Sequence, residues 1–307
     1  MRKTFINSLQ ALAEKDKRIF LLTGDLGFSV LERFKEKYPD RFFDVGIAEQ
    51  NMIGIAAGLA LTGKIVFTYS IVPFVTMRCF EQIRNDLCFQ NLNVKLIGIG
   101  GGVAYGTSGP THHSTEDVAV MRSLVNMTVI TPGDPVETEI AIKYAVKHSG
   151  PVYVRLGKGN EPAVHTSKKL DIRKGIVIEN GKDLTIIVSG GLLNTAKQVT
   201  SALIKYGLSV RLISMPMIKP LDNKAVLESA ARTKAIFTIE EHGIIGGLAD
   251  AVCGILARSN HNVLFEAFAL PDKYSKLVGS QDYILEKQGL SAEKILNRIL
   301  KKWREII

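Results

Sequence analysis

The 307-residue sequence contains only 3 cysteines and 1 tryptophan, and it has no long hydrophobic run. The cysteines, Cys79, Cys88 and Cys253, lack the spacing of metal ligands. So few thiols, in an odd number, exclude a disulfide scaffold and favour a reducing cytoplasm. No stretch approaches the ~18 consecutive apolar residues of a membrane helix, so we expect no membrane segment. Polar residues between Asn7 and Asp16 interrupt the N-terminal segment, and we therefore expect no signal peptide.

Acidic residues are the minority, since 39 Lys and Arg against 30 Asp and Glu give a net charge of +9. Such a balance can indicate nucleic-acid binding, but here the basic residues are scattered and no aromatic residues interleave with them. We therefore expect no nucleic-acid partner, and a basic surface equally suits anionic small substrates. Hydrophobic residues make up 46% and charged residues 22%, a balance that excludes a disordered chain.

Short apolar runs alternate with helical patterns along the chain, which indicates βαβ units and parallel sheets. In the first half we expect strands at 19–22, 42–45, 64–69, 94–99, 128–131 and 152–156, with helices at about 48–61 and 136–147. The pattern weakens between about Asn160 and Lys182. A second series then follows, with strands at 184–189, 210–214, 235–240 and 263–267 and helices at about 193–206, 223–232, 248–257 and 291–303. We predict an α/β protein of two domains, 1–165 and 183–307, each a mostly parallel sheet flanked by helices, with a linker at 166–182.

A carboxylate stands where an expected strand meets a helix, in the run Gly46-Ile47-Ala48-Glu49-Gln50-Asn51-Met52. Taken alone, Glu49 could simply favour the helix N-terminus through the helix dipole. Small residues follow it at helical spacing, and they would let this helix pack closely against a neighbour: Gly54, Ala57 and Gly58. Phe74 follows the next expected strand and is either a core residue or a stacking partner for a ligand.

A glycine-rich loop runs from Gly98 to Ser114, directly after an expected strand. Loops at the carboxyl ends of parallel strands commonly line ligand crevices. This loop is not a dinucleotide-binding loop, because it has no G-x-G-x-x-G and no helix begins directly behind it. His112 and His113 lie within it, and no third ligand has suitable spacing. Their adjacency therefore favours a polar lining over a metal site.

Together and in this order, these pieces resemble the C-terminal half of transketolase, over essentially the whole chain. The run from Gly46 to Met52 is similar to the family's G-I-x-E-x-x-M segment, and Gly109-Pro110-Thr111-His112 is similar to its G-P-T-H loop. The region with Glu240-Glu241-His242 is similar to the family's C-terminal domain. The resemblance implies a thiamine diphosphate enzyme in which a pyrimidine-binding domain precedes a C-terminal domain.

The resemblance also implies that this chain is one subunit of a split transketolase. The family's G-D-G…N motif supplies the Mg²⁺ ligands, and Gly24-Asp25-Leu26-Gly27 does not match it. We therefore expect an N-terminal transketolase subunit as partner, which brings the diphosphate and Mg²⁺ site. The implied assembly holds two copies of each subunit (α₂β₂) in the cytoplasm.

The resemblance assigns cofactor-binding roles to four residues. Glu49 matches the glutamate that contacts the ring nitrogen N1′ of the aminopyrimidine, where a carboxyl can share a proton, and it is an expected catalytic residue. Phe74 matches an aromatic residue that stacks on the pyrimidine, and Ile71 stands where the family has another aromatic. Asp25 lies in a loop resembling the family's S-A-D-L-x-P-S segment. The cofactor supplies the carbanion chemistry, which the protein orients and tunes.

The resemblance assigns substrate-binding roles to a second set of residues. His112, the other expected catalytic residue, matches the histidine that faces the reacting carbon and the substrate hydroxyls. Arg2, Ser29 and Lys158 match residues that contact substrate phosphate. Lys158 replaces a family arginine, and lysine holds phosphate as a point charge without the bidentate fork.

Two departures from the family bear on the substrate. Gly100 stands where the family has a second loop histidine, and Ser108 stands where an aspartate contacts a donor hydroxyl. A site that no longer pairs a hydroxyl selects for it less strongly. We therefore expect transfer of a two-carbon ketol unit from a ketose to an aldose. The ketose is expected to be phosphorylated and to be a deoxy, branched or otherwise modified sugar.

Three alternatives remain open from the sequence. The β subunit of a 2-oxoacid dehydrogenase shares the glutamate and both domains, although Gly109-Pro110-Thr111-His112 favours transketolase. A 1-deoxyxylulose-5-phosphate synthase-like enzyme is normally one long chain and carries an aspartate at the place of Ser108. A non-catalytic assembly subunit would account for Gly100 and Ser108, but not for the retention of Glu49, Phe74 and His112.

Overall fold

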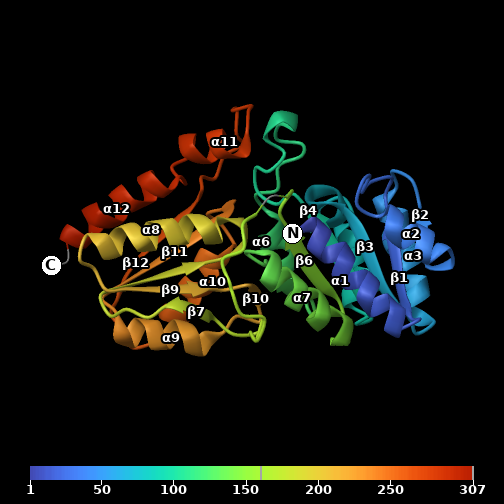
Figure 1. Ribbon diagram of the computed structural model, residues 1–307, viewed down its shortest axis with the longest axis horizontal. Coiled ribbons are helices and arrows are strands. Elements are labelled where there is room, and N and C mark those ends of the chain that lie inside the picture. Colours follow the sequence, from blue (N-terminus) through green and yellow to red (C-terminus); the bar gives the residue numbers. More distant parts are fainter. Residues whose placement is uncertain (160, 306–307) are drawn as a thin grey trace.

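The computed structural model describes residues 1–159 and 161–305 and builds two α/β halves, each around its own sheet (Figure 1). Asn160, where the sequence pattern begins to weaken, lies outside the described residues. The two halves follow the expected fold class, α/β with mostly parallel sheets flanked by helices.

The first sheet has the strand order β10-β5-β6-β4-β3-β1-β2. Its strands are β1 (Ile19–Thr23), β2 (Phe42–Asp44), β3 (Ile65–Ile71), β4 (Val94–Ile99), β5 (Thr128–Ile130), β6 (Val152–Leu156) and β10 (Met217–Lys219). All neighbours are parallel except β10 and β5. The central strands β3, β4 and β6 are buried at every position, which explains their continuous apolar runs.

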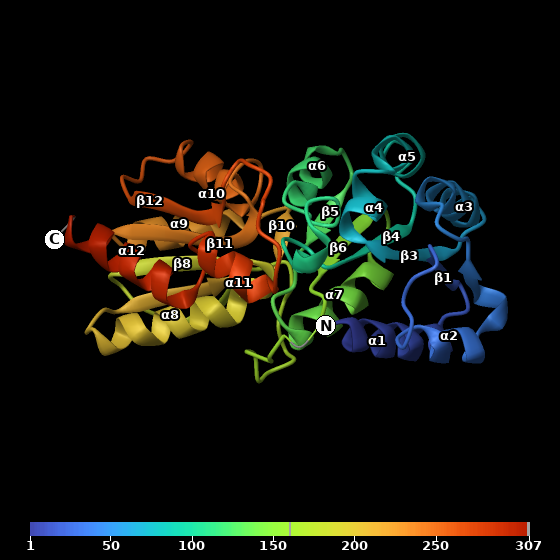
Figure 2. The same cartoon turned by 90° about the horizontal axis from the view of Figure 1, so that it is seen from above.

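Helices cover both faces of this sheet (Figure 2). One face carries α1 (Arg2–Lys15) and α7 (Pro135–Lys147), and the other carries α3 (Glu49–Leu61), α4 (Val72–Thr76) and α6 (Asp117–Ser123). In α1 the buried residues Phe5, Leu9 and Ala13 recur every four positions and form one apolar stripe. Shorter elements complete this half: α2 (Glu32–Lys37), η1 (Pro39–Arg41), α5 (Phe80–Gln82), the π-helix η2 (Ile83–Cys88) and η3 (Gly106–Ser108).

The second sheet has the order β12-β11-β8-β9-β7, with only β7 antiparallel. Its strands are β7 (Ile176–Glu179), β8 (Leu184–Val188), β9 (Val210–Ser214), β11 (Ala235–Gly243) and β12 (Leu264–Leu270). Helices α8 (Leu193–Lys205) and α12 (Ala292–Arg304) pack on one face, and α9 (Asn223–Arg232) and α10 (Leu248–Leu256) pack on the other. The short element η4 (Gly190–Leu192) follows the carboxyl end of β8. Helix α11 (Gln281–Lys287) lies on the side of this half nearest the first half (Figure 1).

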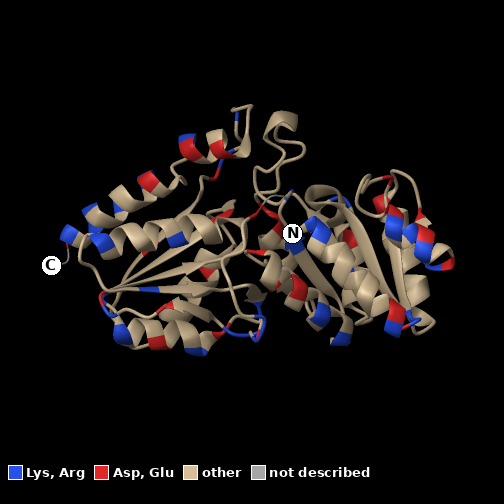
Figure 3. Cartoon of the chain, viewed as in Figure 1, with Lys and Arg blue, Asp and Glu red and all other residues tan. Residues whose placement is uncertain are grey.

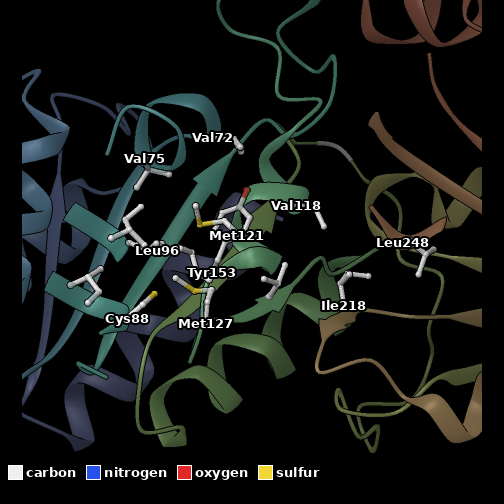
Figure 4. Packing of buried hydrophobic residues seen from close by; sticks show 14 of the residues in the cluster. Val72, Val75, Cys88, Leu96, Val118, Met121, Met127, Tyr153, Ile218 and Leu248 are labelled. Atoms are coloured by element: carbon white, nitrogen blue, oxygen red, sulfur yellow. The ribbon is translucent and has the colours of Figure 1, made fainter. Parts of the chain in front are cut away.

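A shared core joins the two halves. Val118 and Met121 of α6 belong to the same buried cluster as Ile218 of β10 and Leu248 of α10 (Figure 4). Strand β10 comes from the second half of the sequence but extends the first sheet through its antiparallel pairing with β5. The domain limits at 165 and 183 remain predictions, because strand pairing and the core both cross between the halves.

The structure differs from the sequence interpretation in the packing of α3. Gly54 and Gly58 of α3 are exposed, and nothing in the described chain lies within 4 Å of where a Cβ would stand on either glycine. Only Ala57 of that small-residue group is buried. Close packing of the two glycines against a neighbour is therefore not seen within this chain.

Charged side chains are distributed over many elements, with basic and acidic residues intermingled (Figure 3). Within residues 1–159 and 161–305, no helix is both long enough and apolar enough to cross a bilayer.

Candidate active site

Glu49 is the first residue of α3, directly beyond the sharp turn that follows β2. Its side chain is 1% exposed. Ser70 at the end of β3 donates a hydrogen bond from Oγ to Oε1 (2.9 Å), and Arg78 donates from Nη1 to Oε2 (2.6 Å). The loop after β1 passes close by, since a Cβ on Gly24 would lie 3.4 Å from Oε1. Both carboxylate oxygens are thus fixed in a buried position.

Arg78 was not recognised from the sequence. Its side chain is 42% exposed and its guanidinium carbon lies 4.3 Å from the centre of the Phe74 ring, a cation–π contact. The guanidinium therefore bridges the buried Glu49 carboxylate and the Phe74 ring. The signal available in the sequence was the four-residue spacing from Phe74, which places two side chains on one side of a helical turn.

Phe74 contacts the glycine-rich loop through His112. The ring centres of Phe74 and His112 are 5.2 Å apart at an angle of 71°, an edge-to-face contact. Nδ1 of His112 lies 3.0 Å from the Thr111 hydroxyl. Gly109, three residues earlier, has a φ of +75° with open space around it, so the turn needs glycine for its backbone conformation and not for room.

The contacts continue from His112 to a phenol and two cations. The Tyr105 ring centre lies 6.1 Å from that of His112, and Nζ of Lys158 lies 4.5 Å from the Tyr105 ring centre. Arg2 approaches the same group: its guanidinium would lie 3.7 Å from a Cβ on Gly159. Burial raises the pKa of Tyr69 to about 12, although the positive charge of the nearby Arg2 acts to lower it.

We call these residues the contact series: direct contacts link Glu49, Arg78, Phe74, His112, Tyr105 and Lys158 in turn, and Arg2 lies beside them near Gly159. The loop that carries Tyr105 and His112 rises between the two halves beside α11 (Figure 1). Gly279 N–H, just before α11, donates to the Gly106 carbonyl (3.4 Å), so the second half supports this loop. The structure thus brings together five of the residues predicted for the site, Glu49, Phe74, His112, Lys158 and Arg2.

The other predicted residues lie apart from the contact series. Asp25 is exposed, with φ +54°, although it adjoins Gly24, and its N–H donates to Oδ1 of Asp44 (2.9 Å). Ser29 is exposed, with φ +62°. Ser108 is exposed in η3, and Ile71 is buried at the end of β3. Among the described residues, no hydrogen bond, ion pair or aromatic contact joins these four side chains to the contact series.

His113 has different surroundings from His112. It is buried, its Nε2 has no hydrogen-bond partner among the described residues, and burial lowers the pKa of the imidazole. The described chain also holds no group of three His, Cys, Asp or Glu side chains placed to bind a metal ion.

A cavity of about 350 Å³ lies between the halves, lined by Gly101, Arg155, Gly190, Gly191 and Glu241 among others. It reaches the base of the glycine-rich loop but contains no member of the contact series. Burial raises the pKa of Glu241 to about 7, opposed by Arg155 and by hydrogen bonds from Val103 and Gln281. The chemistry of the contact series, and not the size of this cavity, identifies the candidate site.

Comparison with known proteins shows the family of both halves. The family model for the transketolase pyrimidine-binding domain matches residues 1–163, and that for the transketolase C-terminal domain matches residues 173–295. A 6-deoxy-6-sulfo-D-fructose transketolase subunit of Clostridium sp. is 37% identical over 96% of this chain and 92% of that protein. An apulose-4-phosphate transketolase subunit of Phocaeicola vulgatus is 37% identical over 98% of this chain and 96% of that protein.

One solved structure matches nearly the whole chain. It is described as a split gene transketolase in an inactive β4 tetramer, and it superposes with a TM-score of 0.90 at 35% identity. The match covers 98% of this chain and 97% of that one.

Proposed function

Because this chain belongs to the transketolase family, we propose that it is the C-terminal subunit of a two-component, thiamine diphosphate-dependent transketolase. It transfers a two-carbon ketol unit from a ketose to an aldose. The observation that carries the proposal is the contact series, which links a buried carboxylate to an imidazole and then to two cations. Relatives described as transketolase subunits match almost end to end, which supports the two-component organisation.

The residues present fit the pyrimidine end of the cofactor. Glu49 offers a buried carboxylate to a ring nitrogen, Phe74 offers a half-buried aromatic face, and Gly24 keeps the loop beside Glu49 free of a side chain. When bound, thiamine diphosphate supplies the stabilisation of a carbanion. Glu49 holds the proton at the ring nitrogen, and Ser70 and Arg78 fix the orientation of its carboxylate.

The substrate extends along the rest of the contact series. His112 is half-buried beside Phe74 and can donate or accept a hydrogen bond at a substrate hydroxyl. Arg2 and Lys158 would neutralise an anionic group at the far end of the sugar. Asp25, Ser29 and Ser108 contribute once the substrate and the partner subunit are in place.

A partner subunit completes the site in this proposal. The described chain offers no metal-binding cluster, so the N-terminal subunit supplies the Mg²⁺ ligands and holds the diphosphate. Large exposed apolar side chains on the first half, Phe28 (75% exposed), Ile47 (77%) and Leu61 (65%), provide a surface for association. With two copies of each subunit, the assembly is α₂β₂ and lies in the cytoplasm.

The proposed donor is a modified sugar. Gly100 and Ser108 remove an imidazole and a carboxylate that would pair sugar hydroxyls, and a site without them stops selecting for those hydroxyls. Two relatives of similar identity are described with a sulfo-deoxy sugar and with apulose 4-phosphate, neither of which is an ordinary pentose phosphate. Normal transketolase efficiency with xylulose 5-phosphate and ribose 5-phosphate would contradict this part of the proposal.

The experiment is a calorimetric titration of thiamine diphosphate with Mg²⁺, first into this chain and then into this chain mixed with the candidate partner. We expect tight binding only in the mixture. Tight binding to this chain alone, or none to the mixture, would contradict the two-component proposal.

Glu49→Gln then tests the chemistry in the assembled enzyme. Glutamine keeps the shape and the Ser70 contact but cannot share the proton, so we expect ketol transfer to fall by more than ~10²-fold. Glu14→Gln, at a side chain that is 63% exposed, is the matched control and should retain full activity. Full activity of Glu49→Gln would remove Glu49 from the mechanism.

A further inference from the structure

We propose that Tyr105 determines the specificity of this site: its ring occupies the space beside Gly100, and its hydroxyl donates a hydrogen bond to an anionic end group of the sugar. The end group is a tetrahedral oxyanion, a phosphate or a sulfonate. This inference rests on the proposed function and names a residue that reads the substrate.

The Tyr105 ring leaves no space for a side chain at position 100. Gly100 has a φ of +77°, and a Cβ there would lie 2.1 Å from Cε2 of Tyr105. Contact at that distance is far inside van der Waals range, and the positive φ adds strain for any other residue. The ring and the imidazole that the family carries at position 100 are therefore mutually exclusive, and Tyr105 stands in its place.

The surroundings of Tyr105 favour an anion. Lys158 places its ammonium 4.5 Å from the ring centre, and Arg2 lies near enough to lower the phenol pKa, although burial outweighs it and raises that pKa. The phenol is therefore protonated at neutral pH and can donate its hydrogen. Tyr105 is half-buried, and its hydroxyl makes no hydrogen bond with another described residue, so it remains available to a ligand.

The Glu161 carboxylate, close to Lys158 along the chain, does not oppose this assignment. Glu161 accepts a hydrogen bond from Gly159 N–H (2.9 Å) and pairs with the amino group of Met1 (2.9 Å). Its charge is already matched by these donors. The Tyr105 phenol, the Lys158 ammonium and the Arg2 guanidinium thus lie in one region, and the Glu161 carboxylate there is already paired. Donors of this kind suit the oxygens of a phosphate or sulfonate.

The test is Tyr105→Phe, which keeps the ring beside Gly100 and removes only the hydroxyl. In the assembled enzyme we compare three donors: a ketose with a phosphate end, its sulfonate counterpart and the same ketose without an anionic end. A hydrogen bond to a charged group is lost, so we expect kcat/KM to fall about 10-fold or more for at least one anionic donor, mainly through KM. For the uncharged ketose it should change less than about twofold.

The control is Tyr206→Phe, at an exposed tyrosine directly after α8 in the second half. It should leave all three donors unchanged. If phosphate but not sulfonate loses efficiency, the end group is a phosphate, and the reverse result identifies a sulfonate. An equal loss for all three donors, or no loss, would overturn the assignment.

A second readout does not depend on catalysis. Inorganic phosphate and sulfate are titrated into this chain alone and into its Tyr105→Phe variant, with thermal unfolding confirming that both are folded. Weaker binding of either anion to the variant supports the inference even if the assembled enzyme shows no ketol transfer. The absence of ketol transfer would overturn the proposed function alone. Identical anion binding, with transfer intact and unaltered, would overturn only the role of Tyr105.

Discussion

Arg155, near the end of β6, makes hydrogen bonds to both halves. Replacing it with leucine tests how much these bonds contribute to the free energy of unfolding. Its Nε donates to Oδ2 of Asp117 (2.8 Å), and its Nη2 donates to the carbonyls of Ser114 (3.0 Å) and Glu241 (2.9 Å). The side chains of Arg155 and Asp117 are 8% and 0% exposed. The guanidinium also packs under Gly101, where a Cβ would meet it.

The expected loss of stability in Arg155→Leu follows from the buried polar groups that would lose their partner. Asp117 remains buried with only Tyr153 still donating to it (2.7 Å), and two carbonyls lose a donor. Removing one partner of a buried ion pair typically costs about 3–5 kcal/mol, so we expect the free energy of unfolding to fall by about 4 kcal/mol. The ion pair itself need not be stabilising relative to apolar residues, because the cost comes from the uncompensated charge.

The assay is urea unfolding followed by fluorescence of Trp303, the single tryptophan, which is buried in α12. Circular dichroism monitors both halves at once, and loss of a single shared transition would show that the halves unfold separately. Arg173→Leu is the matched control, since the Arg173 side chain is 64% exposed and solvent screens its pairing with Asp171, so we expect little change in stability. Adding Asp117→Asn to Arg155→Leu should recover part of the loss, because it removes the stranded charge.

Acid provides an independent check on the same pair. Burial raises the pKa of Asp117, but Arg155 and His242 outweigh it and hold that pKa below its usual value. The contribution of the pair is therefore present above the pKa of an unfolded aspartate and is lost as pH falls through the lowered one. A cost of Arg155→Leu no larger than that of Arg173→Leu would refute this account of the interface.

Two further predictions concern the junction where α7 begins. Burial raises the pKa of Glu137 to about 7 against a hydrogen bond from Ser214, so its stabilising effect is complete below the unfolded pKa and is lost as pH rises through 7. Glu137→Gln should flatten the dependence of unfolding free energy on pH between 5 and 8, and an unaltered dependence would contradict this. Asp134 accepts hydrogen bonds from the N–H groups of Glu137, Val164 and His165, so Asp134→Ala should cost about 2–4 kcal/mol in urea unfolding and expose the segment 161–175 to limited proteolysis. Unchanged stability and cleavage would show that these contacts do not hold the segment.

The long apolar strands were predictable from the sequence because burial on both faces leaves an unbroken signal. Strands β4, β6 and β9 match the expected ranges residue for residue. The short edge strands β7 and β10 were missed, because three or four residues with mixed burial carry little pattern. Helix α1 was also missed, although Phe5, Leu9 and Ala13 carry the spacing that would have revealed it.

The site was predictable only as far as motifs reach. The family motifs located Glu49 and His112, and Phe74 followed from the same resemblance. Arg78 and Tyr105 could not be found in that way, since their importance lies in contacts across the fold: a guanidinium on a buried carboxylate, and a ring over a glycine. The four-residue spacing of Arg78 from Phe74 is a local signal for their ring contact alone, and it does not point to Glu49.

Strand β10 limits how this protein can be divided. A cut in the linker leaves residues 217–219 with the second half, although they form the outer edge of the first sheet. The first half alone would then present β5 as a bare edge, with backbone donors and acceptors open to any other strand. A chimera made by exchanging halves at the linker would likewise pair β5 of one relative with β10 of another. The unit that can be exchanged between relatives is therefore the whole two-sheet body, and hydrogen bonding in the sheet defines its boundary.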